Sequence, residues 1–343
     1  MPILIEACAR SSVDWDLAHL AACFGSYQRA DSGNIRDCPY RHFHVVIVRA
    51  AVAETETAMN VDFRMGRPGD ADACGRICYE AFGAIASAHG FPNEFPSVQE
   101  ATSVLYVQLK HPSFYSVVAE ADGKVVGSNF LDERSPILGV GPIIVAPDAQ
   151  NCGVGRLLME HVMQRAVEKQ APGVRLLQAT YHSRALSLYA KFGFEVRELV
   201  ACMQGRPIHL AIPGYHVRTA VAADIIDCDA LCARIHGHHR HGEVVDSVKR
   251  GSCLIVEHDG HISGYSAGLG YYNHSVGETN EDLKALIAAA PAFTGPGILV
   301  PAANAGLFRW CLDHGLRIVQ TMTLMTIGLY NEPSGAWFPS VLF

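Results

Sequence analysis

The spacing of apolar residues changes sharply within the segment "IIVAPDAQNCGVGRLLMEHVMQRA", residues 143–166. Its first three residues are apolar and β-branched, which predicts a buried strand. A turn that contains Pro147, Gly153 and Gly155 follows. Apolar side chains then recur at helical spacing, at Leu157, Leu158, Val162 and Met163. The pattern therefore predicts a strand, a glycine-containing turn and, directly after it, an amphipathic helix.

The same order of sequence features occurs twice in the chain. The segment "FRMGRPGDADACGRIC" from Phe63 resembles "VRTAVAADIIDCDALC" from Val217, at an offset of about 154 residues. Further along, "HSRALSLYAKFGFEV" from His182 resembles "NAGLFRWCLDHGLRI" from Asn304, at an offset of about 122 residues. The decreasing offset indicates two copies of one plan, the second with segments removed.

Each copy is predicted to place helices around one sheet. Between the two matches above, "VVAEADGKVVG" resembles "LIVEHDGHISG", and each segment turns at an Asp-Gly pair, Asp122-Gly123 or Asp259-Gly260. An Asp-Gly pair between apolar runs is a strong hairpin signal. The predicted fold class is α/β, of the α+β kind: two tandem domains, each with a central mixed, mostly antiparallel sheet flanked by helices.

The predicted domain boundaries follow from these matches. The first copy covers residues 61–205 and the second covers residues 215–343, and the Pro- and Gly-rich segment "GRPIHLAIPGY" provides a linker at residues 206–214. Residues 1–60 match neither copy, and we interpret them as an appended or weakly ordered extension.

Composition limits the classes of partner. The chain has 343 residues and a net charge of −7, from 27 basic and 34 acidic residues, which argues against nucleic acid as a partner. No apolar run is long enough to span a membrane, and the N-terminus has no signal pattern, so we expect a cytoplasmic protein. The 11 cysteines include no C-x-x-C pair, and we interpret them as small buried residues rather than as metal ligands or disulfides.

The turn before the predicted helix has a specific chemistry. The first backbone N–H groups of a helix have no intrahelical partners, and the helix dipole makes that end partly positive. Glycines at positions 153 and 155 would let a phosphate group approach these amides closely. Two glycines that merely ease a tight loop are the alternative, and the turn alone does not decide between them.

The first copy resembles the GNAT superfamily of N-acetyltransferases, which bind acetyl-CoA, over roughly residues 61–205. "QNCGVG", residues 150–155, resembles the family's Q/R-x-x-G-x-G/A signature, and "SRALSLYAKFGFEV" resembles a second motif of the family, with Tyr189 four residues before Gly193. The resemblance implies two tandem GNAT-like domains and acetyl-CoA as co-substrate, without a metal. It also implies a set of cofactor-binding residues, namely Ile144, Val145, Gln150, Cys152, Gly153, Val154, Gly155, Arg156 and His182.

The resemblance also implies catalytic roles. Acetyl transfer requires an amine that loses a proton, a stabilised carbonyl oxygen and a protonated leaving thiolate. Tyr189 matches the family position that protonates the thiolate, and the backbone N–H of Val145 would stabilise the oxyanion. Glu133, with Asp132, is our candidate for a water-mediated general base, although ordinary surface charges at a turn are the favoured alternative.

One position departs from the family pattern. The family commonly has Asn seven residues before the tyrosine, where its side chain helps to order the cofactor and the nearby backbone, and this chain has His182. Histidine can make a similar hydrogen bond and can also titrate near neutral pH. The substitution makes the handling of protons in the first copy less predictable.

The second copy resembles a degenerate GNAT domain. Where the first copy has its phosphate turn, the second has "HSVGETNEDLKALIAAA", with acidic residues that would repel a pyrophosphate. Cys311 aligns with Tyr189, whereas Asn304 aligns with His182 and keeps the family's commoner residue. The segment "IHGHHRHGE" invites a metal site, but we favour a polar loop because no recognised ligand set completes it.

The predicted function is an acyl-CoA-dependent N-acyltransferase that transfers acetyl to a primary amine by direct attack in a ternary complex. The acceptor would be a small-molecule amine or a lysine-containing peptide, with no nucleic acid or membrane as partner, and a homodimer is compatible with the sequence. A CoA-sensing or ligand-binding protein with decayed catalytic activity is the alternative. The acceptor pocket is expected to involve residues 82–101, including His89, Phe91 and Phe95, and parts of the second copy.

Overall fold

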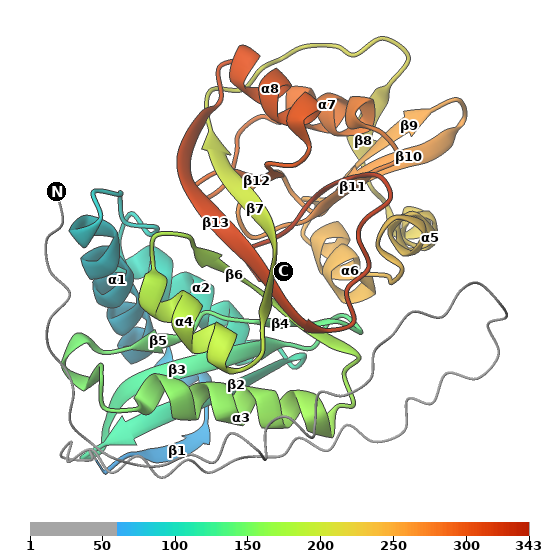
Figure 1. Cartoon of the computed structure of the whole chain (residues 1–343). Helices are drawn as coiled ribbons and strands as arrows, with labels where there is room; N and C mark the ends of the chain where they lie inside the picture. Colours follow the sequence, from blue (N-terminus) through green and yellow to red (C-terminus); the bar gives the residue numbers. More distant parts are fainter. Residues whose placement is uncertain (1–59, 343) are drawn as a thin grey trace, which may run out of the picture. The chain divides into compact units, whose positions relative to one another are not determined.

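The structure is a computed structural model, and it describes residues 60–342. The extension that the sequence predicts over residues 1–60 lies outside the described residues, apart from residue 60. Within the described part, one order of strands and helices occurs twice, as the sequence repeat predicts (Figure 1).

The first copy runs from a short edge strand through two helices and a hairpin to the strand–turn–helix segment. Its elements are β1 (Asp62–Met65), α1 (Ala71–Ala88), α2 (Val98–Lys110), β2 (Phe114–Ala121), β3 (Lys124–Asp132), β4 (Leu138–Val140), β5 (Ile144–Val145), α3 (Val154–Glu168), β6 (Gly173–Ala179), α4 (Ser183–Lys191) and β7 (Glu195–Gln204).

The second copy repeats this order after the linker, with one strand in place of β4 and β5, and ends in an additional short strand. Its elements are β8 (His216–Thr219), α5 (Ile225–His236), α6 (His241–Lys249), β9 (Leu254–His258), β10 (His261–Ser266), β11 (Ser275–Gly277), α7 (Asn280–Ala289), β12 (Ile298–Pro301), α8 (Ala305–Asp313), β13 (Arg317–Gly328) and β14 (Ala336–Phe338).

Both predicted hairpins are present. Asp122 and Gly123 connect β2 to β3 with φ angles of 50° and 71°, and Asp259 and Gly260 connect β9 to β10 with 49° and 80°. A two-residue turn with two positive φ angles matches the right-handed twist of the strands on either side, and Asp-Gly is one of the few pairs that adopt it easily. The local sequence therefore determines both turns.

Paired ion-pair clusters at equivalent positions support the repeat. In the first copy the Arg64 guanidinium donates to Asp70 at 2.8 Å and to Glu120 at 2.5 Å. In the second copy Arg218 makes the same two contacts, with Asp224 at 2.7 Å and with Glu257 at 2.9 Å. These clusters connect the first strand of each copy to the start of its first helix and to the hairpin. The first strand is therefore held in the same way in both copies.

Two sheets form the described part of the chain, and strands are exchanged between the copies. The larger sheet has nine strands in the order β1-β2-β3-β4-β6-β13-β7-β12, with β5 paired to β3. The long strand β13 of the second copy lies between β6 and β7 of the first, with Leu324 opposite both Leu177 and Glu198. In return, β7 pairs with β12 of the second copy, with Val300 opposite Ala201 (Figure 1). The sequence patterns did not predict this exchange.

The smaller sheet belongs to the second copy alone. It has five strands in the order β14-β11-β10-β9-β8, and all of its pairings are antiparallel. The apolar C-terminal segment "GAWFPSVLF" supplies β14 as the edge strand of this sheet.

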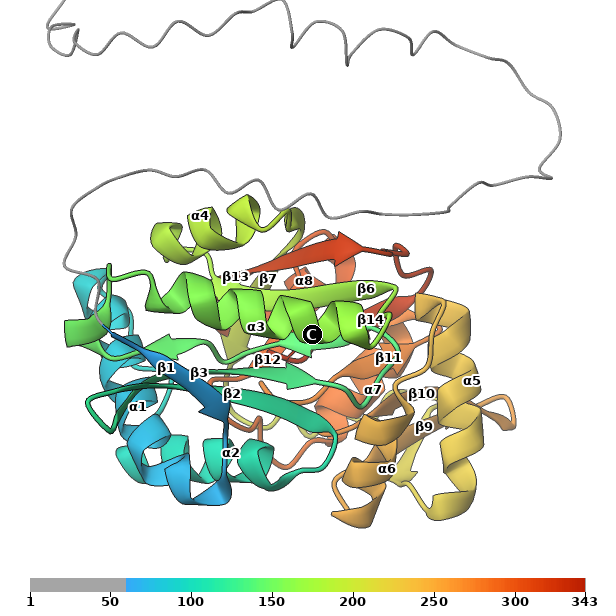
Figure 2. The ribbon, with the colours of Figure 1, turned by 90° about the horizontal axis from the view of Figure 1, so that it is seen from below.

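Helices cover both faces of the first copy's part of the larger sheet. Val117 and Ala119 of β2 pack with Leu158 of α3, whereas Val118, between them, packs with Leu105 of α2. Successive side chains of a strand point to opposite faces, so α3 lies on one face and α2 on the other (Figure 2). The candidate functional site lies where two strands of the larger sheet, β5 and β6, separate.

Candidate functional site

The larger sheet opens between β5 and β6. Strand β4 runs parallel to β6 as far as the pair Gly139–Arg175. The chain then leaves β6, and within residues 60–342 the following strand β5 pairs with β3 alone. Adjacent strands that separate in this way leave backbone groups without a strand partner. They also leave a gap, which helices on both faces of the sheet can line.

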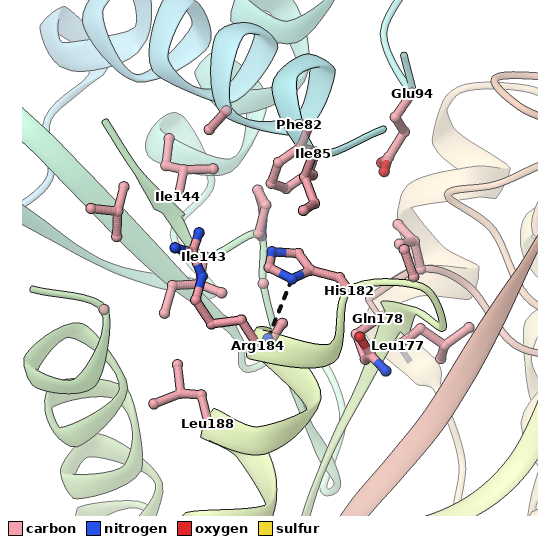
Figure 3. Close-up of a pocket in the computed structure, with 18 of the residues that line it drawn as sticks. Phe82, Ile85, Glu94, Ile143, Ile144, Leu177, Gln178, His182, Arg184 and Leu188 are labelled. Carbon is pink, nitrogen blue, oxygen red and sulfur yellow. Dashed lines mark hydrogen bonds between the residues drawn. The ribbon is translucent and has the colours of Figure 1, made fainter. Parts of the chain in front are cut away.

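A cavity of about 650 Å³ occupies this opening. It is bounded by α1, the segment between α1 and α2, β4, β5, the turn before α3, β6 and α4, and Figure 3 shows Phe82 and Ile85 facing His182 and Leu188 across it. Most of the predicted site residues line it: Ile144, Val145, Gln150, Gly153, Gly155, Arg156, His182 and Tyr189.

The backbone of Val145 faces the open side of β5. Ala146 donates its N–H to the Val126 carbonyl at 2.8 Å, and Val145 lies opposite Gly127. Hydrogen-bonded and non-hydrogen-bonded pairs alternate along an antiparallel ladder, so the N–H and C=O of Val145 point away from β3. The Gln150 side-chain amide donates to that carbonyl at 3.1 Å, and the N–H on the same side is placed to donate to a ligand.

The turn before α3 exposes a helix N-terminus to the cavity. Gly153 is the N-cap residue with φ 81°, a left-handed conformation that favours glycine, and the first turn of α3 contains no acidic residue. A Cβ added at Gly153 would meet nothing within 4 Å in the described part of the chain. The amides that follow this open space can therefore receive an anion.

Arg184, at the start of α4, holds this turn in place, and the sequence motifs did not identify it. Its guanidinium donates to the Gln150 side chain at 2.5 Å and to the Asn151 side chain at 3.1 Å, and the residue also lines the cavity (Figure 3). The two contacts span more than 30 residues of sequence, and no local pattern encodes them. Arg184 therefore places a positive charge next to the helix N-terminus.

His182 caps helix α4. Its Nδ1 accepts a hydrogen bond from the N–H of Ala185 at 3.3 Å, drawn dashed in Figure 3. In the second copy the Oδ1 of Asn304 accepts from Leu307 at the same distance, at the start of α8. Burial, assisted by Arg184, lowers the pKa of His182 below its usual value. A neutral ring whose Nδ1 accepts carries its proton on Nε2, so His182 can donate into the cavity.

Tyr189 lies on the inner side of α4. Its side chain is buried, lines the cavity and contacts the ring of Phe194 edge-on with the ring centroids 6.2 Å apart. Burial raises the pKa of the Tyr189 hydroxyl well above its usual value, so it holds its proton at physiological pH. A protonated phenol at this position can act as a proton donor.

Three predicted residues lie outside the cavity lining. The Glu133 carboxylate accepts from Arg165 at 2.7 Å and pairs with Lys169 at 2.8 Å, at the far end of α3. Val154 is buried in the core beneath the turn. The Cys152 side chain bonds to the Gln150 carbonyl at 3.6 Å. The cavity thus contains most of the predicted cofactor-binding residues but not the predicted base.

Glu94 is the carboxylate that the cavity does contain. It lies in the segment between α1 and α2, which the sequence predicted only as part of an acceptor wall, and Figure 3 shows its carboxylate directed toward the cavity. Burial raises the pKa of Glu94 to about 7, and a hydrogen bond with the Tyr271 hydroxyl opposes that shift. A carboxylate with such a pKa can accept a proton near neutral pH.

The second copy supplies part of the cavity wall. Five of its residues line the cavity beside Glu94: Tyr271, Tyr272, Met322, Val341 and Leu342. On the side of the first copy, the ring of Tyr181 stacks on Phe91 with the ring centroids 4.4 Å apart and on His89 at 5.3 Å. Of the residues predicted for the acceptor wall, Phe95 lines the cavity, whereas His89 and Phe91 contact Tyr181, which lines it.

The equivalent helix N-terminus of the second copy is capped by side chains of the protein. Helix α7 begins with a capping box, in which the Asp282 carboxylate accepts from both the N–H and the hydroxyl of Thr279 at 2.8 Å. The Ser263 hydroxyl donates to the same carboxylate. The cavity beside this helix, of about 780 Å³, is lined by several carboxylates and amides, namely Glu198, Glu278, Glu332, Asn280 and Asn304.

The histidine-rich segment is not simply a polar loop. His236 is buried at the end of α5 and contacts Trp337 edge-on, and burial lowers its pKa well below the usual value. Among residues 60–342, no group of three or more His, Cys, Asp or Glu side chains is arranged to hold a metal ion. The prediction of a polar loop was therefore wrong for His236, which lies within α5.

In the part of the chain that the structure describes, none of the helices has the length and apolar character needed to cross a bilayer.

Comparisons with known proteins match parts of the chain. Residues 112–196 match the family model of the acetyltransferase (GNAT) domain. The chain is 32% identical over 82 residues to mycothiol acetyltransferase from Tsukamurella paurometabola, a match that covers 23% of this chain and 28% of that protein. It is 28% identical over 110 residues to the UPF0157 protein YqkA from Bacillus subtilis, covering 32% of this chain and 30% of that protein. The chain thus spans less than a third of the length of either relative.

Solved structures extend the likeness to the fold of both copies. A crystal structure of an acetyltransferase candidate from Pyrococcus horikoshii superposes with a TM-score of 0.63 at 14% identity, and the match covers 83% of this chain and 98% of that one. At this identity the likeness shows the fold. The predicted fold class is confirmed: the chain has a GNAT-like α/β fold of mixed sheets flanked by helices, and residues 112–196 match the model of the acetyltransferase (GNAT) domain.

Proposed function

We propose that the chain is an acyl-CoA-dependent N-acyltransferase, which transfers acetyl from acetyl-CoA to a primary amine by direct attack in a ternary complex. The observation that carries this proposal is the cavity between β5 and β6, which joins an open helix N-terminus to a buried tyrosine and a carboxylate of raised pKa. The match of residues 112–196 to the GNAT domain supports it.

The turn before α3 fits the donor. The amides after Gly153 would bind the pyrophosphate of CoA, and Arg184 would add a positive charge beside them. The pantetheine arm would then lie in the gap between β5 and β6, where the N–H of Val145 would stabilise the carbonyl oxygen as negative charge develops on it. We propose that only the first copy binds CoA, and that the second copy is degenerate.

We assign the general base to Glu94 rather than to Glu133, because Glu94 lines the cavity and Glu133 is held by Arg165 and Lys169. Glu94 would accept a proton from the ammonium of the acceptor. As the C–N bond forms and the C–S bond breaks, Tyr189 would protonate the departing thiolate. The nitrogen would lose its second proton as the amide forms, and that proton would restore the Tyr189 phenol. His182 keeps the capping role of its counterpart Asn304, so it gives no reason to favour a CoA sensor with decayed activity.

The assignment of Glu94 predicts a specific pH dependence. We expect kcat/KM of the full chain, measured by release of the CoA thiol, to rise with pH through about 7. This direction follows because the base must be deprotonated. Glu94→Gln should lower the rate ~100-fold or more. Tyr271→Phe should move the rising limb to higher pH, because it removes the hydrogen bond that lowers the pKa of Glu94.

The matched control is Glu133→Gln, which removes a carboxylate outside the cavity. This variant should keep the wild-type rate and pH profile. A pH profile that Glu133→Gln alters and Glu94→Gln leaves intact would contradict the assignment.

A further inference from the structure

Two glutamine side chains in the cavity wall carry polar atoms with unmet hydrogen bonds. Gln108 of α2 and Gln178 of β6 are each only 5% exposed, and both line the cavity. The Oε1 of Gln108 and both the Oε1 and Nε2 of Gln178 have no hydrogen-bond partner within the described part of the chain. Buried polar groups are normally paired, so these three atoms indicate a ligand or bound water that supplies the partners.

The atoms left unpaired differ in kind. Two are oxygens that accept hydrogen bonds, and one is an amide nitrogen that donates. A single group that paired with all three atoms would therefore have to donate as well as accept. A hydroxyl or a carboxamide does both, whereas an ammonium only donates and a carboxylate only accepts. The wall thus favours a neutral polar group on the molecule that enters the cavity.

The charges around the cavity limit the ligand further. Glu94 is the one Asp or Glu among the described residues that line it. The lining cations lie on the turn before α3 and at the start of α4, where the CoA phosphates are expected, and comprise Arg156 and Arg184. A second ammonium would therefore enter without a counterion, and a carboxylate near Glu94 would be repelled, both at a high cost in a buried site.

The remaining surface near Glu94 is largely apolar and aromatic. Phe82, Phe95, Tyr271 and Tyr272 line the cavity together with aliphatic side chains of α1 and α2. Such walls bind an apolar or aromatic body in preference to a sugar or an extended polar chain.

We propose that the acceptor is a primary monoamine with an apolar or aromatic body and one neutral hydroxyl or carboxamide group, which Gln108 and Gln178 bind. This inference rests on the proposed N-acyltransferase function. It excludes polyamines, aminoglycosides and free amino acids as preferred acceptors, and it assigns Gln108 and Gln178 as specificity-determining residues.

A series of matched amines tests the proposal with the full chain. We expect tyramine to be acetylated with a kcat/KM at least about 10-fold above that of 2-phenylethylamine, which lacks the hydroxyl. Phenylalanine, which adds a carboxylate, and spermidine, which adds charges, should each fall at least about 10-fold below tyramine. A wild-type enzyme that prefers spermidine, glucosamine or a free amino acid would overturn the inference while supporting acetyl transfer.

Two variants test whether Gln108 and Gln178 cause the preference for tyramine over 2-phenylethylamine. Gln108→Leu and Gln178→Leu should each reduce the preference for tyramine over 2-phenylethylamine, and leave the KM for acetyl-CoA within about twofold of the wild-type value. Gln164→Leu, an exposed substitution on α3, is the matched control and should change neither quantity. If the variants raise the KM for acetyl-CoA and keep the preference, the glutamines bind the donor and the inference is wrong.

Binding measured without turnover separates this inference from the proposed function. Thermal shifts with tyramine and 2-phenylethylamine are compared in the presence of CoA. A larger shift with tyramine, combined with no acetylation of tyramine when acetyl-CoA is supplied, would support binding of this class of amine and contradict the proposed function. Equal shifts with both amines would overturn the inference whatever the turnover.

Discussion

The N-termini of α3 and α7 occupy equivalent places in the two copies, and they are completed in different ways. At α3 the cap is Gly153, the first turn carries no acid, and Arg184 lies beside the turn. At α7 the cap is Thr279, and the Asp282 carboxylate accepts from Thr279 and Ser263. The first arrangement leaves amides for an external anion, whereas in the second the protein supplies the anion itself.

The comparison separates the features that both copies share from those that only the first copy has. The second copy keeps its hairpin, its Arg218 cluster and its Asn304 cap, all of which stabilise local structure. The features that differ are those that would contact CoA: the glycine turn and the position of Tyr189, where Cys311 is buried in the core. On our proposal, the second copy now serves the first by supplying β13 and part of the cavity wall.

The largest predicted difference between the copies concerns Tyr189, which we propose as the acid that protonates the leaving thiolate. We expect Tyr189→Phe to lower kcat ~100-fold or more, because the thiolate would leave unprotonated. The KM for acetyl-CoA should change little. Cys311→Ala, at the aligned position of the second copy, should leave kcat unchanged. A Tyr189→Phe enzyme within twofold of the wild-type rate would refute the assignment.

The second predicted effect concerns Asp282, whose carboxylate caps the start of α7. Asp282→Ala removes the acceptor of three hydrogen bonds at the start of α7 and leaves their donors unpaired. We expect the free energy of unfolding, measured with urea, to fall by ~2 kcal/mol. Acetyl-CoA should still raise the melting temperature of this variant by as much as it does for wild type. If Asp282→Ala abolished that increase, α7 rather than α3 would be implicated in CoA binding.

The smallest effect tests whether the caps are interchangeable. His182→Asn gives the first copy the residue that caps α8 in the second, and it should change stability by less than ~0.5 kcal/mol. His182→Ala, which removes the acceptor for the Ala185 N–H, should cost ~1 kcal/mol. Both variants should keep the pH profile of the wild type. A pH limb that disappears in His182→Asn would show that the ring titrates in the reaction.

Local features of the fold and site could be predicted from the sequence. Asp122-Gly123 and Asp259-Gly260 determine their hairpins because few residue pairs adopt two positive φ angles. Gly153 and Tyr189 were predicted because each lies in a motif that resembles one of the GNAT superfamily.

Features that depend on contacts between distant segments could not be predicted. The exchange of β13 between β6 and β7 depends on pairing of strands more than 100 residues apart, which local periodicity does not encode. The contact of Arg184 with Gln150 and the approach of Glu94 to Tyr271 depend on how separate segments meet. Glu133 has the residue type of a base, but its partners on α3 give it a structural role.

The stoichiometry of acetyl-CoA binding, measured by isothermal titration calorimetry on the full chain, tests the central claim most directly. Our account predicts one site per chain, which Gly153→Glu removes by placing a carboxylate and a strained backbone in the turn, and which Asn280→Glu at the start of α7 leaves intact. Circular dichroism should show that both variants are folded. Two sites per chain, or one site that persists in folded Gly153→Glu, would contradict the claim that only the first copy binds CoA.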